Sequence, residues 1–501
     1  MSEDARRLFA KFRRDNQTKL VSTFIISEEK SKVDAWPKDK KKTPQEMSDA
    51  ADISVQKVTE AEDASEEERK SKDRGAFDRL AAEYLGEMNA FFRLIPNTMS
   101  ILPVVEQIDI HRTIYERSIK DATLISKDEE FEVYEMRFDQ VGRIDRDFEA
   151  IKSFQAGRKL LPGMFLMGLI SSYDAFLAKL LKLFFVTKPE ALSSSERNIS
   201  FKDLASLGSV EAAREMILEK EIESVLRLSH HAQFEWLGKQ LGISLTKNLE
   251  IWPSFVEICE RRNLHTHTQG VVSLQYLKVC AEQNLTFKNK PKVGEKLGIG
   301  PDYLRNAISV ISELGLKLAQ VVWRKLIPSE IDVASESLSN IGYNLIVLRR
   351  YRLACKMLDF GLNEMKKHGE EGTRKRMVVN YANAKKLLGE KEEAAKILSG
   401  EDWTAVSDIF RFCVAAVKDD VPTLIGMMPK MVGSEEMSKQ DIRDWPVFRG
   451  VKDNQEFVAA FEKTFGEPYF TDKTSADKAD TATDSTLETR RETKAVKSAS
   501  S

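Results

Sequence analysis

The sequence predicts an all-α protein with a central helical bundle, a C-terminal α-solenoid and disordered arms. Apolar residues recur at intervals of three and four over most of the chain, as on the buried face of an amphipathic helix. Strand-like alternation is short and rare, and residues 271–274 are its best candidate. The last third of the chain also repeats small and apolar residues at the spacing of paired helices.

Composition and periodicity divide the chain into five regions. Residues 1–75 are dense in Lys, Glu, Asp and Ser over much of their length, and residues 468–501 are rich in Ser, Thr, Asp and Lys. Neither can bury enough apolar surface to offset its ordering entropy, so we expect a largely disordered or weakly helical arm and a disordered tail. Between them we expect a helical extension at 76–158, a helical bundle at 159–328 and helix pairs at 335–467.

The overall composition is that of an ordinary soluble protein. The chain has 501 residues, of which 42% are hydrophobic and 31% charged, with a formal net charge of −2. No global basic field attracts nucleic acid, so any contact with RNA must come from a local patch. The four cysteines lack CxxC spacing, which argues against a disulfide framework and a zinc site. No nucleotide-binding or zinc-hydrolase motif is visible, and we expect no cofactor and no metal.

Neither the N-terminus nor the most apolar run indicates a membrane protein. The first residues carry charge and no apolar signal-peptide core, so we expect a cytoplasmic location. The run 160–186 contains a proline, two glycines, an aspartate and two lysines. A spanning helix needs about 20 consecutive apolar residues with few charges. We therefore expect a buried helix there and no membrane contact.

The C-terminal helix pairs have the spacing of tetratricopeptide units. Gly342 and Ala354 are small residues of a first pair, and Ala382 and Ala394 belong to a second. In such units small residues let the two helices approach closely. Ala354 and Ala394 lie further apart than the usual 34 or so residues, so the first unit must have a longer second helix or an insertion. We expect the repeats to bind a protein or peptide partner.

A polar run in the central bundle carries the candidate chemistry. It reads Arg262-Asn263-Leu264-His265-Thr266-His267. On a continuous helix Asn263 and His267 lie one turn apart, with Arg262 flanking them, and His265 points partly elsewhere. An arginine offers a forked cation to a phosphate, and a histidine can move protons near neutral pH. Together they could support attack of an RNA 2′-hydroxyl on its own phosphate without a metal.

Spacing alone leaves a structural interpretation open. Arginine and histidine also complement the macrodipole at a helix C-terminus. Attack of the 2′-hydroxyl on the phosphate requires both a general acid and a general base, and one histidine does not supply both. A symmetric dimer that places two copies face to face would supply two histidines and two arginines.

The surroundings of this run resemble the HEPN superfamily, and within it the group labelled RiboL-PSP-HEPN. The family signature is Arg, commonly Asn, and a His after four to six intervening residues. Here it reads Arg262-Asn263-x-x-x-His267, and Gly270 is followed by Val272-x-x-x-Tyr276-Leu277, as is frequent in the group. Upstream segments look like the earlier core helices. The resemblance covers about residues 160–325, a third of the chain.

The resemblance implies a helical bundle that dimerises through its motif helices. Many members are metal-independent endoribonucleases of toxin–antitoxin or antiviral systems, which would give Arg262, Asn263 and His267 the catalytic roles. His265 matches no family position. Other members bind nucleic acid or partners without cutting, so a non-catalytic RNA- or protein-binding scaffold is the alternative. We favour a homodimeric endoribonuclease acting on RNA, with His267 as general acid–base, Arg262 on the phosphate and Asn263 positioning both.

Overall fold

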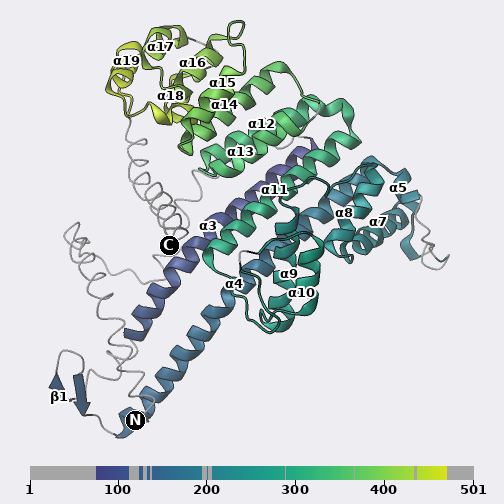
Figure 1. Cartoon of the computed structure of the whole chain (residues 1–501), viewed down its shortest axis with the longest axis vertical. Helices are drawn as coiled ribbons and strands as arrows, with labels where there is room; N and C mark the ends of the chain where they lie inside the picture. Colours follow the sequence, from purple (N-terminus) through teal and green to yellow (C-terminus); the bar gives the residue numbers. More distant parts are fainter. Residues whose placement is uncertain are drawn as a thin grey trace. The chain divides into compact units, whose positions relative to one another are not determined.

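The computed structural model shows a predominantly α-helical chain (Figure 1). The all-α class is confirmed at this level, and one short β pair is the exception among the described residues. The predicted arm at 1–75 lies outside the described residues except for Gly75, as does the predicted tail beyond residue 470. The described residues are 75–111, 123–127, 132–135, 138–193, 200, 206–287, 289–365, 367–433 and 437–470.

The described residues fall into two compact units. The first holds 76–79, 86–175 and 252–308, and the second holds 80–85, 176–251 and 309–470, within the described ranges. Three helices contribute residues to both units: α3 (Ala76–His111), α4 (Phe138–Thr187) and α11 (Pro301–Leu326). The boundary expected between extension and bundle, at 158/159, falls inside α4, which is a single helix.

In the first unit, α3 and α4 run antiparallel. The Ser172 hydroxyl of α4 donates to the Glu87 carboxylate of α3. Further along, Arg158 of α4 forms a 2.9 Å ion pair with Glu106 of α3. Residue numbers therefore rise along α3 while the numbers of their contact partners on α4 fall, as expected for antiparallel helices. In the sequence between them, β1 (Thr123–Lys127) and β2 (Glu132–Glu135) form a two-stranded antiparallel sheet.

The motif lies on α9 (Trp252–Thr268), as the apolar spacing predicts. The first half of α9 is buried on nearly all sides, and Phe255 packs edge-on against Tyr173 of α4 with 5.2 Å between ring centroids. A short segment leads to α10 (Leu274–Glu282), whose first turn is capped by the Ser273 hydroxyl. This cap accepts a hydrogen bond from the Tyr276 N–H and satisfies one of the free donors at the helix start.

The chain turns sharply where α9 ends. The Gly270 N–H donates to the Leu264 carbonyl at 3.0 Å, which closes the last turn of the helix. The strand considered at 271–274 is reduced to one antiparallel bridge between Val271 and Lys296. The alternating pattern there reflects a short extended connection rather than a sheet, because α10 begins at once.

The second unit includes the N-terminal part of α3 and the rest of α11. The Tyr84 hydroxyl of α3 donates to the Ile311 carbonyl of α11 at 2.7 Å, and the Tyr84 ring stacks on Phe176 of α4. A Cβ at Gly315 would overlap the Tyr84 ring, so this glycine permits the close approach of α3 and α11. The same unit contains α5 (Glu190–Ser193), α7 (Val210–Leu226) and α8 (His230–Leu241).

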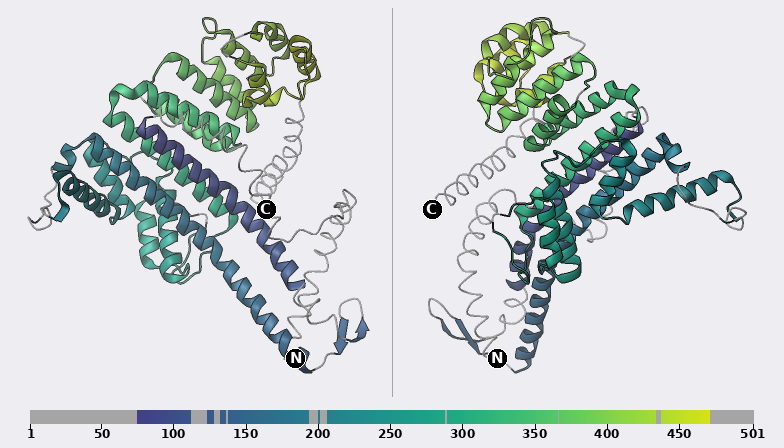
Figure 2. Two further views of the ribbon diagram at one scale, coloured as in Figure 1. Left: turned by 180° about the vertical axis from the view of Figure 1, so that it is seen from behind. Right: turned by 45° about the vertical axis from the view of Figure 1, so that its right-hand side comes forward.

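Short helices follow one another through the C-terminal part of the second unit (Figure 2). Each packs on its neighbours in chain order: α12 on α13 and α14, α14 on α15 and α16, and α17 on α19. They are η2 (Pro328–Glu330), α12 (Ile331–Val347), α13 (Tyr351–Asp359), η3 (Phe360–Glu364), α14 (Glu371–Leu387), α15 (Lys391–Ser399), α16 (Asp408–Val417), α17 (Val421–Met427), η4 (Met428–Met431), α18 (Lys439–Asp444), η5 (Pro446–Gly450) and α19 (Gln455–Phe465).

The small residues expected between paired helices do lie at close contacts. A Cβ added to Gly342 of α12 would be 2.5 Å from Leu358 Cδ2 of α13, so only glycine fits there without a shift. Ala354, Ala382 and Ala394 are all buried. The second helix of the first pair is long, because α13 continues through the π-helical turn η3 before the loop that precedes α14.

The apolar run 160–186 lies within α4. One helix among the described residues, Glu149–Thr187, is long and apolar enough to cross a membrane by length and composition, and 33% of its most apolar window is buried in the protein. Its fully buried residues include Leu166, Ile170 and Tyr173. The predicted helix is present, but its burial is partial, because Leu160, Met164 and Val186 of the same run are exposed.

Candidate functional site

The candidate residues occupy the part of α9 that emerges from the core. Arg262 and Asn263 are half-buried, and His267 is exposed. At about 100° per residue, Arg262 and His267 lie about 140° apart around the helix axis, with Asn263 between them. The structure therefore places all three along one accessible side of α9. No hydrogen bond joins any two of these three side chains in the described chain.

Arg261, which sequence reasoning overlooked, is held inside the protein. Its guanidinium lies 2.8 Å from Glu257 Oε1, donates to the Gly298 carbonyl at 2.9 Å and sits over the Tyr303 ring. Burial alone would lower the pKa of Arg261, but the Glu257 carboxylate and the tyrosines outweigh it and raise that pKa. This arginine is a fixed structural cation.

Glu257 is the centre of that buried network. Its carboxylate also accepts hydrogen bonds from the Tyr276 hydroxyl at 2.7 Å and the Tyr303 hydroxyl at 2.8 Å. Burial and the adjacent carboxylate raise the pKa of both phenols, so they remain donors. The sequence does hold a signal for this network, since Glu257 and Arg261 are spaced for an ion pair on one helix face.

Arg262 contrasts with Arg261. Its Nε is buried and has no hydrogen-bond partner among the described residues, and no ion pair to a described carboxylate holds its guanidinium. Next to it, Asn263 donates to Glu260 Oε1 at 3.2 Å. A buried, unsatisfied donor is costly. The Arg262 guanidinium is therefore not committed to a partner among the described residues.

The two histidines of the run differ in the same way. His265 Nε2 lies 3.0 Å from the Leu297 carbonyl, and because a carbonyl only accepts, Nε2 carries the proton. Its ring lies against Gly163 of α4 and Gly270. Burial lowers the pKa of His265, the Leu297 carbonyl opposes this, and the nearby Arg261 and Lys296 charges reinforce it. His265 is thus a neutral hydrogen-bond donor within the fold.

His267 is exposed and makes no hydrogen bond or ion pair with a described residue. His265 was expected to point partly elsewhere than Asn263 and His267, and its ring contacts Leu297 and Gly270. Gly270 is needed for this arrangement, because its φ of +86° lies in the left-handed region. A Cβ there would approach both the His265 ring and the Leu297 carbonyl.

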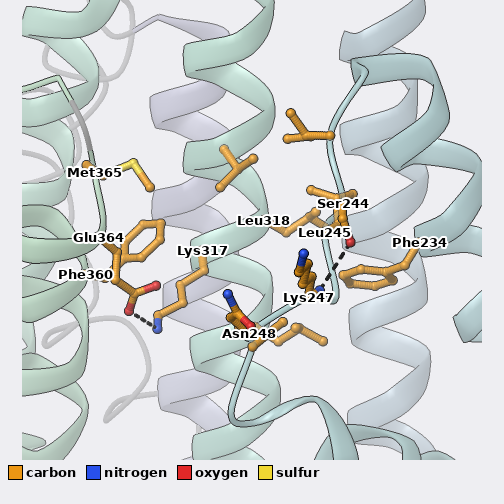
Figure 3. A pocket seen from close by; sticks show the side chains of 14 residues that line it. Phe234, Ser244, Leu245, Lys247, Asn248, Lys317, Leu318, Phe360, Glu364 and Met365 are labelled. Carbon is orange, nitrogen blue, oxygen red and sulfur yellow. Dashed lines mark hydrogen bonds and ion pairs between the residues drawn. The ribbon is translucent and has the colours of Figure 1, made fainter.

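A hollow of about 570 Å³ lies in the second unit (Figure 3). Phe234 and Leu245 line one side, and Phe360 and Glu364 of η3 line the other. Lys317 Nζ lies 3.0 Å from Glu364 and over the Phe360 ring, so its charge is already neutralised by the chain. None of the predicted site residues lines this hollow.

The described residues contain no group of three or more His, Cys, Asp or Glu side chains placed to hold a metal ion. The four cysteines are all buried and free. Burial raises the pKa of three of them, Cys280, Cys355 and Cys413, to about 12, so these thiols stay protonated.

Comparisons with protein-family models, with curated proteins and with solved structures found no match to this chain.

Proposed function

We propose that this chain is a HEPN-like, metal-independent endoribonuclease that acts as a homodimer on RNA. One observation supports the proposal most directly: within seven residues of α9, Arg261 and His265 are engaged in the fold, whereas Arg262 and His267 have no such partners among the described residues. Both residues left without partners belong to the three that the family signature assigns to catalysis, and the third, Asn263, donates to Glu260. A role in toxin–antitoxin or antiviral defence follows from the same resemblance, and we place that role in the cytoplasm as part of the proposal.

The chemistry requires groups on both sides of one phosphodiester. One neutral His267 takes the proton of the RNA 2′-hydroxyl, and that oxygen attacks the adjacent phosphorus. The bond from phosphorus to the 5′-oxygen breaks, and a protonated His267 from a second copy gives that oxygen its proton. Arg262 binds the non-bridging oxygens as negative charge builds on them, and Asn263 orients the ring and the phosphate. The products are a 2′,3′-cyclic phosphate and a 5′-hydroxyl.

The test is cleavage of a structured RNA pool in EDTA by the purified full chain. His267→Ala and Arg262→Ala are each expected to reduce cleavage by about 100-fold or more, with unchanged circular dichroism. His368→Ala removes an exposed histidine outside α9 and should leave the rate unchanged. Equal cleavage by the wild type and His267→Ala would reject the proposal. The wild type should also arrest growth on expression, and the Arg262→Ala/His267→Ala double variant should not.

The second candidate function is a scaffold that binds RNA or a protein without cutting. It is favoured by the series of helix pairs in the second unit, which we propose to be a tetratricopeptide-like array, and by the absence of any described side chain that orients His267. The segment η5 packs on α14 and α16, and its Arg449 donates to the carbonyls of Ile346 and Val347 at the end of α12. A peptide would have to bind outside the area that η5 covers.

RNA binding separates the two candidates. If the wild type binds RNA but releases no cyclic-phosphate product, and Arg262→Ala weakens binding while His267→Ala does not, the scaffold function holds. If both variants bind RNA like the wild type but lose cleavage, the endoribonuclease function holds.

A further inference from the structure

The second half of α3 exposes an apolar stripe. Residues 94–105 read LIPNTMSILPVV and contain no charged residue, in a chain of which 31% is charged. Five large aliphatic side chains on this part of the helix are between 42% and 62% exposed. We name them the α3 stripe: Leu94, Ile101, Val104, Val105 and Ile108.

The stripe occupies one side of the helix. At about 100° per residue its five members fall within an arc of about 100°. Glu106 projects about 150° from the middle of that arc, and it is the residue that α3 turns toward α4. It is buried, with a 2.9 Å ion pair to Arg158 and a 2.8 Å hydrogen bond from Gln155.

This part of α3 therefore exposes large aliphatic side chains on the side opposite Glu106. Its inner side holds Glu106 together with the buried Ile95 and the half-buried Met99 and Leu102, so α3 is apolar on both sides here. Burying aliphatic side chains is favourable at roughly 25 cal/mol per Å² of apolar surface, and contiguous exposed apolar surface marks an interaction site. Among the described residues, nothing covers the stripe.

The spacing of the stripe indicates that a helix covers it. Leu94, Ile101 and Ile108 recur every seven residues, and the two intermediate positions are the polar Asn97 and the apolar Val104. This is the seam along which two helices pack side chain into side chain. The two prolines within α3, Pro96 and Pro103, fall on the far side of the helix from the stripe and leave the seam intact.

We propose that the α3 stripe binds the α3 stripe of a second copy of this chain. A two-fold contact sets the same surface against itself, so a charged surface repels its own copy and an uncharged one does not. Residues 94–105 meet this condition. A lipid surface is the poorer match, because helices that lie on membranes carry Lys and Arg on the polar face. Here the described charged residue of 94–108, Glu106, is acidic and points inward.

This interface is independent of the chemistry at α9. It uses α3, not the motif helices through which the family resemblance implies dimerisation. The proposed ribonuclease does need a second copy, and that link alone rests on the proposed function. A dimer without nuclease activity would leave the stripe proposal intact, and an active dimer joined elsewhere would not.

The first experiment measures the mass of the full-length chain by sedimentation over a range of concentrations. The wild type is expected to dimerise, and Ile101→Glu/Ile108→Glu is expected to raise the dissociation constant at least about tenfold, because it sets carboxylates against each other. The control Val210→Glu/Val432→Glu alters two equally exposed valines elsewhere and should dimerise like the wild type. A wild type that stays monomeric, or a stripe variant with the wild-type constant, overturns the proposal.

A second experiment does not depend on charge. Single substitutions Ile101→Cys, Val104→Cys and Ile108→Cys place an exposed thiol on the stripe of a chain whose own cysteines are all buried. At least one should form a disulfide-linked dimer under mild oxidation, and Val210→Cys should not. No crosslinking above that control overturns the proposal. The proposal is also overturned if the wild type floats with phosphatidylcholine vesicles and Ile101→Glu/Ile108→Glu does not. That result would show that the stripe binds lipid.

Discussion

Glu257 and Arg261, one turn apart on α9, form a buried ion pair of 2.8 Å. Glu257 is 7% exposed, and its carboxylate also accepts hydrogen bonds from two tyrosines on later segments of the chain. The pair thus ties the motif helix to α10 and to the start of α11. Arg262, the next residue, has no comparable anchor among the described residues. We therefore expect substitution of these two adjacent arginines to have different effects on the free energy of unfolding.

Arg261→Ala should lower the free energy of unfolding by about 3–5 kcal/mol, because it leaves the Glu257 charge buried without its cation. Arg262→Ala should lower it by less, about 1 kcal/mol, because Arg262 is half-buried but no ion pair or hydrogen bond of its guanidinium with a described residue is lost. Urea denaturation of both variants at one pH measures this difference. Equal destabilisation would show that Arg262 is also bound within the fold and would remove its availability to a phosphate.

His265 should make stability depend on pH. Burial holds the pKa of folded His265 below its ordinary value of 6.5, so the unfolded chain binds a proton more readily than the folded one. The contribution of neutral His265 to the free energy of unfolding is therefore complete above the unfolded pKa of 6.5. It is lost as the pH falls from that value toward the lower pKa of the folded chain. We expect the wild type to lose more unfolding free energy between neutral pH and about pH 5 than His265→Gln, whose amide can still donate to the Leu297 carbonyl.

His267→Gln is the matched control for that measurement. Its ring is exposed, so its replacement should leave the wild-type dependence of unfolding free energy on pH unchanged. If His265→Gln and His267→Gln both follow the wild-type curve, the fold does not depend on a neutral His265.

Apolar spacing was sufficient to predict the helices but not their surroundings. The buried positions of α9 and α4 follow the 3.6-residue period, which is why the helix at 160–186 and the placement of Arg262, Asn263 and His267 could be read from the sequence. The anchor of Arg261 could not, since Gly298 and Tyr303 come from a distant segment. The α3 stripe was missed for a related reason, because periodicity shows which side of a helix is apolar and not whether anything covers it.

Gly270 should be essential to the end of α9. In Gly270→Ala the Cβ would meet the Leu297 carbonyl oxygen at 2.8 Å and the His265 ring at 2.9 Å, in addition to the strain of a left-handed φ of +86°. We expect a loss of about 2–4 kcal/mol in unfolding free energy. Gly294→Ala isolates the backbone cost, because Gly294 has a φ of +85° with no atom within 4 Å of its added Cβ, and should cost about 1–2 kcal/mol. Equal losses would mean that no steric contact is made at Gly270.

Gly342 and Gly426 separate helix propensity from helix packing in the second unit. Both lie inside helices, so alanine gains about 1 kcal/mol at each from a stiffer unfolded chain and better helix propensity. At Gly426 nothing lies within 4 Å of the added Cβ, and Gly426→Ala should raise the thermal midpoint. At Gly342 the Cβ meets Leu358, which is itself fully buried. Overpacking of this kind costs about 1–3 kcal/mol, so Gly342→Ala should lower the midpoint. If both variants raised the thermal midpoint, α12 and α13 would not be packed closely at Gly342. The argument for a tetratricopeptide-like pair would then fail.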